Sequence, residues 1–278
     1  MYIAQISDCH ITVSGKAYGK AATNIAVQAA VNHLNKLPTK PDCTIITGDI
    51  TDAGSREEYL IANELLSNLE MPFFMIPGNH DHRATMRDVF SQHEYLQRDV
   101  SNASIRYSIE EFPVRLIGLD SLRPGLHGGG IDDEDLTWLG QKLADEQPTV
   151  VFMHHPPFAT GVSYMDEEGF FNASRLKSIL NAAPSVLRVC CGHIHRPIMH
   201  MFGTTPACVC PSTGLQLSLD LTRGAPECFV LEPNGFALHC FGTSIGGEEY
   251  LTTHFGVIPE SGRSFDGPYP FYDVVSPS

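Results

Sequence analysis

Positive charge is scarce in this sequence. Lys and Arg total 18 against 32 Asp and Glu, which gives a formal net charge of −14 at pH 7. A protein that holds duplex nucleic acid or an anionic bilayer needs a basic surface, so this composition argues against polymeric nucleic acid and membranes as partners. A small anionic substrate stays possible, because bound divalent cations would reverse the sign of a local site.

Long apolar runs are also absent. No stretch reaches the roughly 18 apolar residues that span a membrane, and the N-terminus lacks the basic and apolar segments of a secretory signal. We therefore expect a cytoplasmic protein. The eight cysteines include no C-x-x-C pair, which argues against a zinc ribbon and favours reduced, mostly buried thiols. A disulfide near the C-terminal region stays open.

Strands and helices are predicted to alternate through the first two thirds of the chain. Apolar, β-branched runs predict the strands, and apolar residues at helical spacing predict the helices. Strands are expected at 1–6, 43–47, 73–76, 114–119, 149–153 and 186–190, and helices at about 21–37, after a capping box at 55–58, irregularly up to about 96, at 132–143 and at 173–182. This alternation predicts βαβ units and a mainly parallel inner sheet.

The pattern changes after Pro197. Short β-like runs at 207–210, 215–221, 228–231 and 236–240 are separated by Gly, Pro and Asn, which is typical of hairpins. We predict one domain over 1–258, with a metal-binding core at 1–197 and a C-terminal β region at 198–258. The Pro- and aromatic-rich residues 259–278 are expected to form an irregular tail that packs on its own domain or on a neighbouring subunit.

Five polar clusters each follow a predicted strand. They are Asp8-Cys9-His10, Gly48-Asp49, Gly78-Asn79-His80-Asp81, His154-His155 and Gly192-His193-Ile194-His195. Functional groups in open α/β sheets lie outside the carboxyl ends of the strands, so these clusters should converge on one edge. Imidazole, carboxylate and amide oxygen together form a ligand set that suits Fe, Mn, Zn or Co better than Ca or Mg alone.

These ligands predict two metal ions. One ion would be held by Asp8, His10, Asp49 and His195, and the other by Asp49, Asn79, His154 and His193. Asp49 is the expected bridge, because a carboxylate can give one oxygen to each ion. Two ions ~3.5–4 Å apart can activate a shared water and stabilise in-line phosphoryl transfer. His80 could donate a proton to the phosphoryl or leaving oxygen, and Asp81 could orient His80 or the turn.

The five blocks resemble the calcineurin-like metallophosphoesterase superfamily, whose pattern is D-x-H, GD, GNH[D/E], H and GHxH. The match covers residues 8–195 and fills every ligand position. The wider motifs resemble most the bacterial branch of cyclic-nucleotide phosphodiesterases and glycerophosphodiesterases. These motifs are residues 5–10, 48–52, 76–81, 152–157 and 191–195.

The resemblance implies a fold, a reaction and a cofactor. The fold would be an α/β sandwich of two mixed sheets flanked by helices, with the late hairpins extending the second sheet. The protein would be a binuclear phosphodiesterase that cleaves 3′,5′-cyclic nucleotides or glycerophosphodiesters by in-line attack of a metal-held hydroxide. The ions would be divalent or mixed-valence, Fe and Mn first, Zn or Co otherwise. In glycerophosphodiesterase relatives the C-terminal β region also supports oligomers, so a homo-oligomer is possible.

Several alternatives remain open. The chain could be a phosphomonoesterase or a nucleotide pyrophosphatase of the same superfamily, and a non-catalytic scaffold or a nuclease acting on long DNA is less favoured. His155 is interpreted as a neighbour of His154 rather than a ligand, and Asp120-Ser121 as a structural strand end. Four residues could either line the substrate pocket or simply pack over the sheet edge: Tyr18, Phe158, Tyr164 and Met165.

Overall fold

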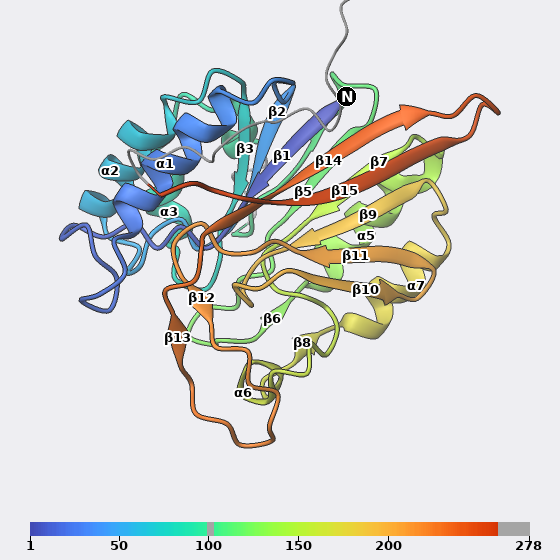
Figure 1. Ribbon diagram of the computed structural model, residues 1–278. Helices are drawn as coiled ribbons and strands as arrows, with labels where there is room; N and C mark the ends of the chain where they lie inside the picture. The colour runs from blue at the N-terminus through green and yellow to red at the C-terminus, as the bar shows by residue number, and fades with distance from the viewer. Residues whose placement is uncertain (99–102, 261–278) are drawn as a thin grey trace, which may run out of the picture.

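Two β-sheets pack face to face between two layers of helices (Figure 1). This computed structural model describes residues 1–98 and 103–260. The predicted sandwich of two mixed sheets flanked by helices is therefore confirmed. Most of the predicted tail, residues 261–278, lies outside the described residues.

The first sheet has five strands in the order β15-β14-β1-β2-β3. The strands β1 (Tyr2–Ile6), β2 (Cys43–Thr47) and β3 (Phe73–Ile76) are parallel, as the alternation of strand and helix requires. The late strands β14 (Gly235–Thr243) and β15 (Glu249–Val257) add an antiparallel hairpin beside β1. Helices α1 (Thr23–Asn35), α2 (Arg56–Leu66) and α3 (Arg83–Val89) lie together on the outer side of this sheet (Figure 1).

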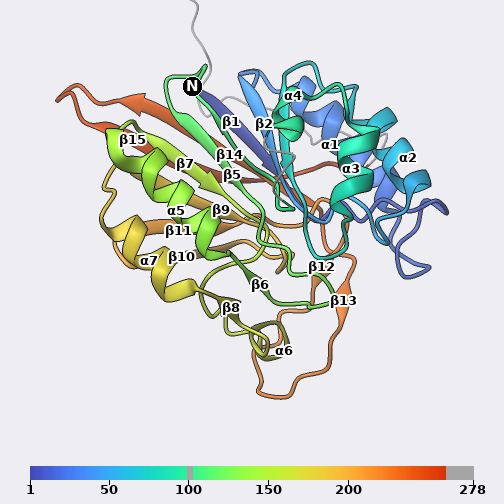
Figure 2. The same ribbon diagram turned by 180° about the vertical axis from the view of Figure 1, so that it is seen from behind.

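The second sheet has six strands in the order β10-β11-β9-β7-β5-β4. Its strands are β4 (Arg106–Ile109), β5 (Arg115–Leu119), β7 (Thr149–Phe152), β9 (Val186–Cys191), β10 (Ile198–Phe202) and β11 (Thr205–Val209). The four inner strands are parallel and the two edge strands antiparallel. Figure 2 shows α5 (Asp133–Lys142) and α7 (Ala173–Asn181) covering the outer side.

Short elements connect and cap the two sheets. They are α4 (Glu94–Gln97), η1 (Leu143–Asp145), α6 (Ser163–Asp166), and the small pairs β6 (Gly129–Gly130) with β8 (Phe170–Phe171) and β12 (Gln216–Leu217) with β13 (Phe229–Val230). The predicted capping box at Ser55 is present, with Ser55 and Glu58 each bonded to the other's backbone N–H. No helix in the described part of the chain is long and apolar enough to cross a membrane.

Three strands of the two main sheets carry no prediction from the sequence. The edge strands β10 and β15 are largely exposed, and polar residues interrupt both of them, His200 in β10 and Thr252 to His254 in β15. An edge strand tolerates such residues because it buries less surface than a central one. The third, β4, is the opposite edge of the second sheet. The late strands also divide between the sheets: β10 and β11 extend the second sheet as expected, whereas β14 and β15 complete the first.

Candidate metal centre

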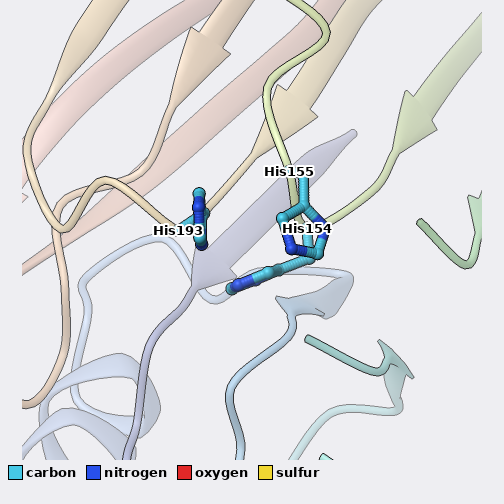
Figure 3. Close-up of side chains that lie close together, drawn as sticks. All are labelled: His154, His155 and His193. Atoms are coloured by element: carbon cyan, nitrogen blue, oxygen red, sulfur yellow. The ribbon is translucent and has the colours of Figure 1, made fainter. Parts of the chain in front are cut away.

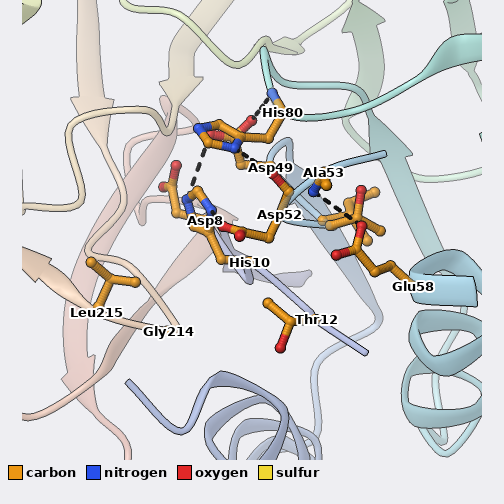
Figure 4. A network of polar contacts seen from close by, with 12 residues as sticks. Asp8, His10, Thr12, Asp49, Asp52, Ala53, Glu58, His80, Gly214 and Leu215 are labelled. Carbon is orange, nitrogen blue, oxygen red and sulfur yellow. Dashed lines mark hydrogen bonds and ion pairs between the residues drawn. The ribbon is translucent and has the colours of Figure 1, made fainter. Parts of the chain in front are cut away.

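The loops that follow five strands bring the seven predicted ligands together. Asp8 and His10 follow β1, Asp49 follows β2, Asn79 follows β3, His154 follows β7, and His193 and His195 follow β9. In the first predicted group, Asp8, His10, Asp49 and His195 are buried and place their ligand atoms within 4.8 Å of one another. Figure 4 shows Asp8, His10 and Asp49 pointing toward one another.

The second predicted group lies on the other side of Asp49. The Nε2 atom of His154 is 3.2 Å from Asp49 Oδ2 and 3.1 Å from Asn79 Oδ1. His193 faces the rings of His154 and His155, as Figure 3 shows. The same Asp49 Oδ2 is 3.7 Å from His10 Nε2, so this oxygen faces a histidine of each group.

Hydrogen bonds set the tautomers of three of the histidines. His154 Nδ1 is 2.7 Å from the carbonyl oxygen of Thr47, and His195 Nδ1 is 2.8 Å from that of Leu215. His10 Nδ1 is 3.0 Å from the Asp52 carboxylate. Because these oxygens only accept hydrogen bonds, each Nδ1 carries a proton, which leaves Nε2 as the ring atom available to bind a proton or a cation.

These ring nitrogens and carboxylate oxygens face one another at short distances. The Nε2 atoms of His10 and His195 are 3.2 Å apart, and Asp8 Oδ2 is buried with no hydrogen-bond partner among the described residues. Such an arrangement of acceptors is unfavourable unless a proton or a cation lies among them. The residues therefore fit a pair of metal ions.

The pKa values of the histidines and of Asp49 also show that this cluster favours a bound positive charge. Burial lowers the pKa of His154, but the adjacent Asp49 carboxylate outweighs burial and raises that pKa to about 9. Burial would raise the pKa of Asp49, yet His154 and the other imidazoles hold it well below its usual range. Burial lowers the pKa of His195 to about 4. In a metal-free centre a proton on His154 thus takes the place of a cation.

The backbone at the ligands is strained. Five of the seven have positive φ angles: Asp8 (52°), His10 (42°), Asp49 (47°), His193 (73°) and His195 (54°). The left-handed region costs a residue with a Cβ atom roughly 1–2 kcal/mol. Such strain persists only where the surrounding structure imposes it, and it clusters at functional sites.

Two motif glycines allow the loops to approach this closely. A Cβ atom at Gly78 would lie 2.2 Å from Asp49 Oδ1 and 2.4 Å from the Asp49 amide nitrogen. At Gly192 it would lie 2.0 Å from Ser7 Oγ. The glycines of the GNH and GHxH blocks are thus required by space, and they let the ligand loops touch.

His80 and Asp81 differ in what they contact. The His80 amide donates to Asp49 Oδ1 at 2.9 Å, its Nδ1 is 2.7 Å from the carbonyl oxygen of Asp52, and its ring packs edge-on against His10. Asp81 accepts hydrogen bonds from the amides of Gly78, Ile50 and Thr51 and from the side chains of Thr51 and Tyr59. Asp81 therefore holds the loops after β2 and β3 together and orients the turn, not the His80 ring.

A cavity of about 300 Å³ opens beside the predicted ligands. His10, Asp49, Asn79, His80, His193 and His195 line one side of it. Of the four predicted wall residues, Tyr18, Tyr164 and Met165 line the cavity, whereas Phe158 stacks on His200 with ring centroids 4.1 Å apart. The walls that the sequence did not indicate are His127, Leu215, Leu217, Glu227, Cys228 and Phe229.

Several supporting residues also escaped prediction. Asp52, in the Gly48–Asp52 motif, could have been suspected from its carboxylate alone, whereas the Leu215 carbonyl has no sequence signal. Asp120 pairs with Arg83 through two hydrogen bonds, which agrees with a structural strand end. Ser121 lies closer to the site, because its Oγ is 2.9 Å from His155 Nδ1. His155 itself contacts both His154 and His193.

The chain is similar to known proteins in family pattern, sequence and fold. Residues 1–197 match the family model described as calcineurin-like phosphoesterase. The chain is 37% identical over 277 residues to a probable glycerophosphodiester phosphodiesterase from Arcobacter nitrofigilis, covering 98% of this chain and 97% of that protein. It is 30% identical over 234 residues to a probable cyclic nucleotide phosphodiesterase from Synechococcus, covering 84% and 88%.

A solved structure shows the same fold. A dimetal phosphatase from Danio rerio superimposes with a TM-score of 0.65 and covers 94% of this chain and 97% of its own. The two sequences are 14% identical, so this likeness concerns the fold alone.

Proposed function

We propose that this chain, which belongs to the calcineurin-like phosphoesterase family, hydrolyses small phosphodiesters at a binuclear metal centre. Glycerophosphodiesters are the first substrate class, and 3′,5′-cyclic nucleotides are the alternative. The observation that carries this proposal is the convergence of histidine Nε2 atoms and carboxylate oxygens at His10, Asp49 and His154, which requires a proton or a cation among them. The sequence similarity to named diesterases over nearly the whole chain supports the substrate class.

The ligand assignment of the centre follows the two groups described above. Asp8, His10, Asp49 and His195 would hold one ion, and Asp49, Asn79, His154 and His193 the other. A dimetal site is typical of this family. Fe and Mn are the proposed metals, with Zn and Co as alternatives that suit the same mixed nitrogen and oxygen ligands. When bound, the pair supplies Lewis acidity and lowers the pKa of water at the site.

The chain's own residues provide orientation and proton transfer. Asp49 lies between the two ligand groups, so its position sets their separation. His80 holds its Nδ1 proton against the carbonyl oxygen of Asp52, which leaves Nε2 as the nitrogen for the substrate. We assign His80 to donate a proton or a hydrogen bond from Nε2 to the leaving oxygen, since it lines the cavity next to the ligands. This step requires the imidazolium form, which carries a second proton on Nε2.

The cavity favours a small diester. Its volume of about 300 Å³ is at the lower end of the usual range for small-molecule sites. Tyr18 and Phe229 form an aromatic wall with ring centroids 5.4 Å apart. A compact alcohol on one side of the phosphate fits such a space, whereas a polymeric nucleic acid conflicts with the net charge of −14.

The first test compares bis(p-nitrophenyl) phosphate with p-nitrophenyl phosphate, each with added Mn²⁺ and with chelator. We expect the diester to be preferred and its hydrolysis to be lost in chelator and in Asp49→Asn. Asp88→Asn is the matched control, because this carboxylate is exposed and, among the described residues, its ion pair is with the exposed Arg56. Parallel assays with glycerophosphoethanolamine and cyclic AMP then separate the two diester classes.

Other outcomes of this assay are equally informative. A preference for the monoester would retain the metal centre and replace the substrate class by phosphomonoesters. Activity on neither substrate, with metal bound, would favour the scaffold interpretation. Full activity of Asp49→Asn would contradict the ligand assignment.

The chain is proposed to form a single domain and to assemble as a homo-oligomer. Residues 1–258 are taken as one domain, and this is supported by β10, β11, β14 and β15 continuing the two sheets of residues 1–197. A homo-oligomer through the C-terminal β region is supported by the exposed edge strand β15, which carries exposed Tyr250 and Phe255. Light scattering on the intact chain tests the oligomer, and a monomeric mass at high protein concentration would exclude it.

A further inference from the structure

A second cluster of metal-ligating side chains lies between the two sheets, outside the metal centre described above. Cys190 on β9 and Cys208 on β11 occupy directly paired positions of the second sheet. His239 on β14 and Gln5 on β1 meet them from the first sheet. All four side chains are fully buried, so the cluster joins both sheets in the middle of the core.

The distances in this cluster are those of a tetrahedral site. The two sulfur atoms are 4.0 Å apart, and Cys190 Sγ is 3.7 Å from His239 Nε2. Gln5 Oε1 is 3.0 Å from the same Nε2. With Zn–S near 2.3 Å and Zn–N near 2.0–2.1 Å, a tetrahedral ion places its sulfur ligands about 3.8 Å apart and sulfur and nitrogen about 3.5 Å apart. The observed sulfur–sulfur and Cys190–His239 distances are each about 0.2 Å longer than these values, and Cys208 Sγ lies within 4.8 Å of a His239 ring nitrogen.

We propose that Cys190, Cys208 and His239 hold a structural zinc-type ion, with Gln5 Oε1 as the fourth ligand. Two thiolates neutralise a divalent ion, which reduces the cost of placing charge in an apolar core. Thiolate and imidazole ligands select a soft cation, in contrast to the mixed nitrogen and oxygen set of the dimetal centre. The site has no open position for substrate, so its role is to clamp one sheet to the other.

The residues around the cluster already hold the ligands in place. His239 Nδ1 lies 2.8 Å from Thr253 Oγ1, so an Nδ1 proton would have an acceptor once Nε2 binds the ion. The Gln5 amide group donates to Thr47 Oγ1 and to the carbonyl oxygen of Cys191, both at 2.9 Å. These two bonds turn Oε1 toward His239. Binding would release one proton from each thiol, and the imidazole would stay neutral with its proton moved to Nδ1.

A buried cation beside the cluster is the second observation. Arg188 is two residues from Cys190 on the same strand, and it is buried. One of its terminal nitrogens donates to the carbonyl oxygen of Leu251, but its Nε has no partner, and no carboxylate pairs with it in the described part of the chain. Burial raises the pKa of the Cys190 thiol, whereas the Arg188 charge acts to lower it. A thiolate at Cys190 would thus be favoured by Arg188.

The competing explanation is a core network without metal. In that case His239 donates from Nε2 to Gln5 Oε1 and accepts at Nδ1 from Thr253, and the thiols merely pack. The two explanations differ in a property that needs no catalytic assay, namely whether thiolate sulfur binds the metal.

The experiment replaces zinc by cobalt. The full chain is produced with Co²⁺ available while it folds, because the closed core would not load afterwards. We expect a near-ultraviolet thiolate-to-cobalt charge-transfer band and one bound ion per chain beyond the dimetal centre. None of the seven predicted ligands of that centre is a cysteine, and the variants below distinguish the core cluster from Cys228, which lines the adjacent cavity. Absence of the band in protein with a filled dimetal centre would overturn the proposal, whatever the protein hydrolyses.

Two variants identify the cysteines that give rise to the charge-transfer band. Cys208→Val should abolish it, remove one ion per chain and lower the melting temperature of the metal-loaded protein. Cys43→Val is the matched control, because Cys43 is also a fully buried strand cysteine but lies outside the cluster. It should keep the band. A band that survives Cys208→Val would contradict the ligand set, and if this variant fails to fold, the wild-type band and ion count still decide.

Discussion

Residues 1–197 and 198–258 contribute to the metal centre in different ways. All seven predicted ligands come from the first region. The second region provides no predicted ligand, yet it positions two of them: Ser212 Oγ donates to the carbonyl oxygen of Asp8 at 2.9 Å, and the Leu215 carbonyl accepts from His195 Nδ1. The first region therefore supplies every predicted ligand, whereas both regions position them.

Substitution of Gly78 by alanine should have the largest effect, because it disturbs the ligand region itself. The new Cβ atom would meet the Asp49 backbone and carboxylate, and a misplacement of about 1 Å at a reacting centre can cost ~100-fold in rate. We expect at least that loss of diester hydrolysis, measured as kcat/KM, together with a lower metal content.

The control for this substitution is Gly140→Ala. Gly140 lies within α5, and a Cβ atom there meets nothing within 4 Å. Alanine in a helix is favoured over glycine by roughly 0.5–1 kcal/mol, so this variant should be slightly more stable and fully active. Normal kcat/KM for Gly78→Ala would show that the ligand loops are less tightly packed than the distances indicate.

Ser212→Ala tests the positioning role of the second region. Ser212 Oγ also accepts from the amides of Gly214 and Leu215, so its loss leaves buried N–H groups unpaired at a cost of about 1–3 kcal/mol. Loosening the Leu215 carbonyl that holds His195 should weaken metal binding by ~10- to 100-fold. Metal titration of the variant measures this effect. Ser212→Cys is the conservative variant. Unchanged metal affinity in Ser212→Ala would show that only the first region positions the ligands.

Metal affinity should depend on pH because His154, in the first region, carries a proton in the metal-free protein. In the metal-free protein burial lowers the pKa of His154, but the Asp49 carboxylate raises it more strongly. The resulting pKa is about 9, compared with the usual 6.5. The stability contributed by this protonated pair is complete below about pH 6.5 and is lost as pH rises through about 9. An incoming ion must displace the proton, so affinity should rise by up to ~tenfold per pH unit in that window. Calorimetric titration of metal-free protein would show it, and a flat profile would contradict it.

The smallest expected effect is the contribution to stability of one aromatic contact between the two regions, at the wall of the cavity. Tyr18 and Phe229 have ring centroids 5.4 Å apart and planes inclined by 34°. An aromatic pair contributes about 0.5–1.5 kcal/mol beyond the area it buries, and the lower figure is expected because Tyr18 is largely exposed. A double-mutant cycle with Tyr18→Ala and Phe229→Ala, read by unfolding free energy, measures it. Strictly additive losses would show that the regions meet there without coupling.

The same division explains what could be predicted from sequence. The strand runs before Asp8, Asp49 and Asn79 are apolar and short, and each ends in a ligand cluster, so both fold class and site could be inferred. The exposed edge strands β10 and β15 are interrupted by polar residues and end in no ligand cluster. Backbone atoms such as the Leu215 carbonyl have no residue type to indicate them, and Phe229 reaches the cavity from strand β13, far along the chain from the ligand motifs.

Five predicted ligands have positive φ angles: Asp8, His10, Asp49, His193 and His195. At these positions the residue that would make the fold most stable differs from the residue that the metal centre needs. Glycine would relax the backbone at each of these positions, and it would also delete a ligand. Stabilising such a chain by choosing the residue that best suits each local conformation would therefore remove its chemistry first. The fold retains these side chains at a local energetic disadvantage, so any margin of stability must come from elsewhere, chiefly from the closely packed space between the two sheets.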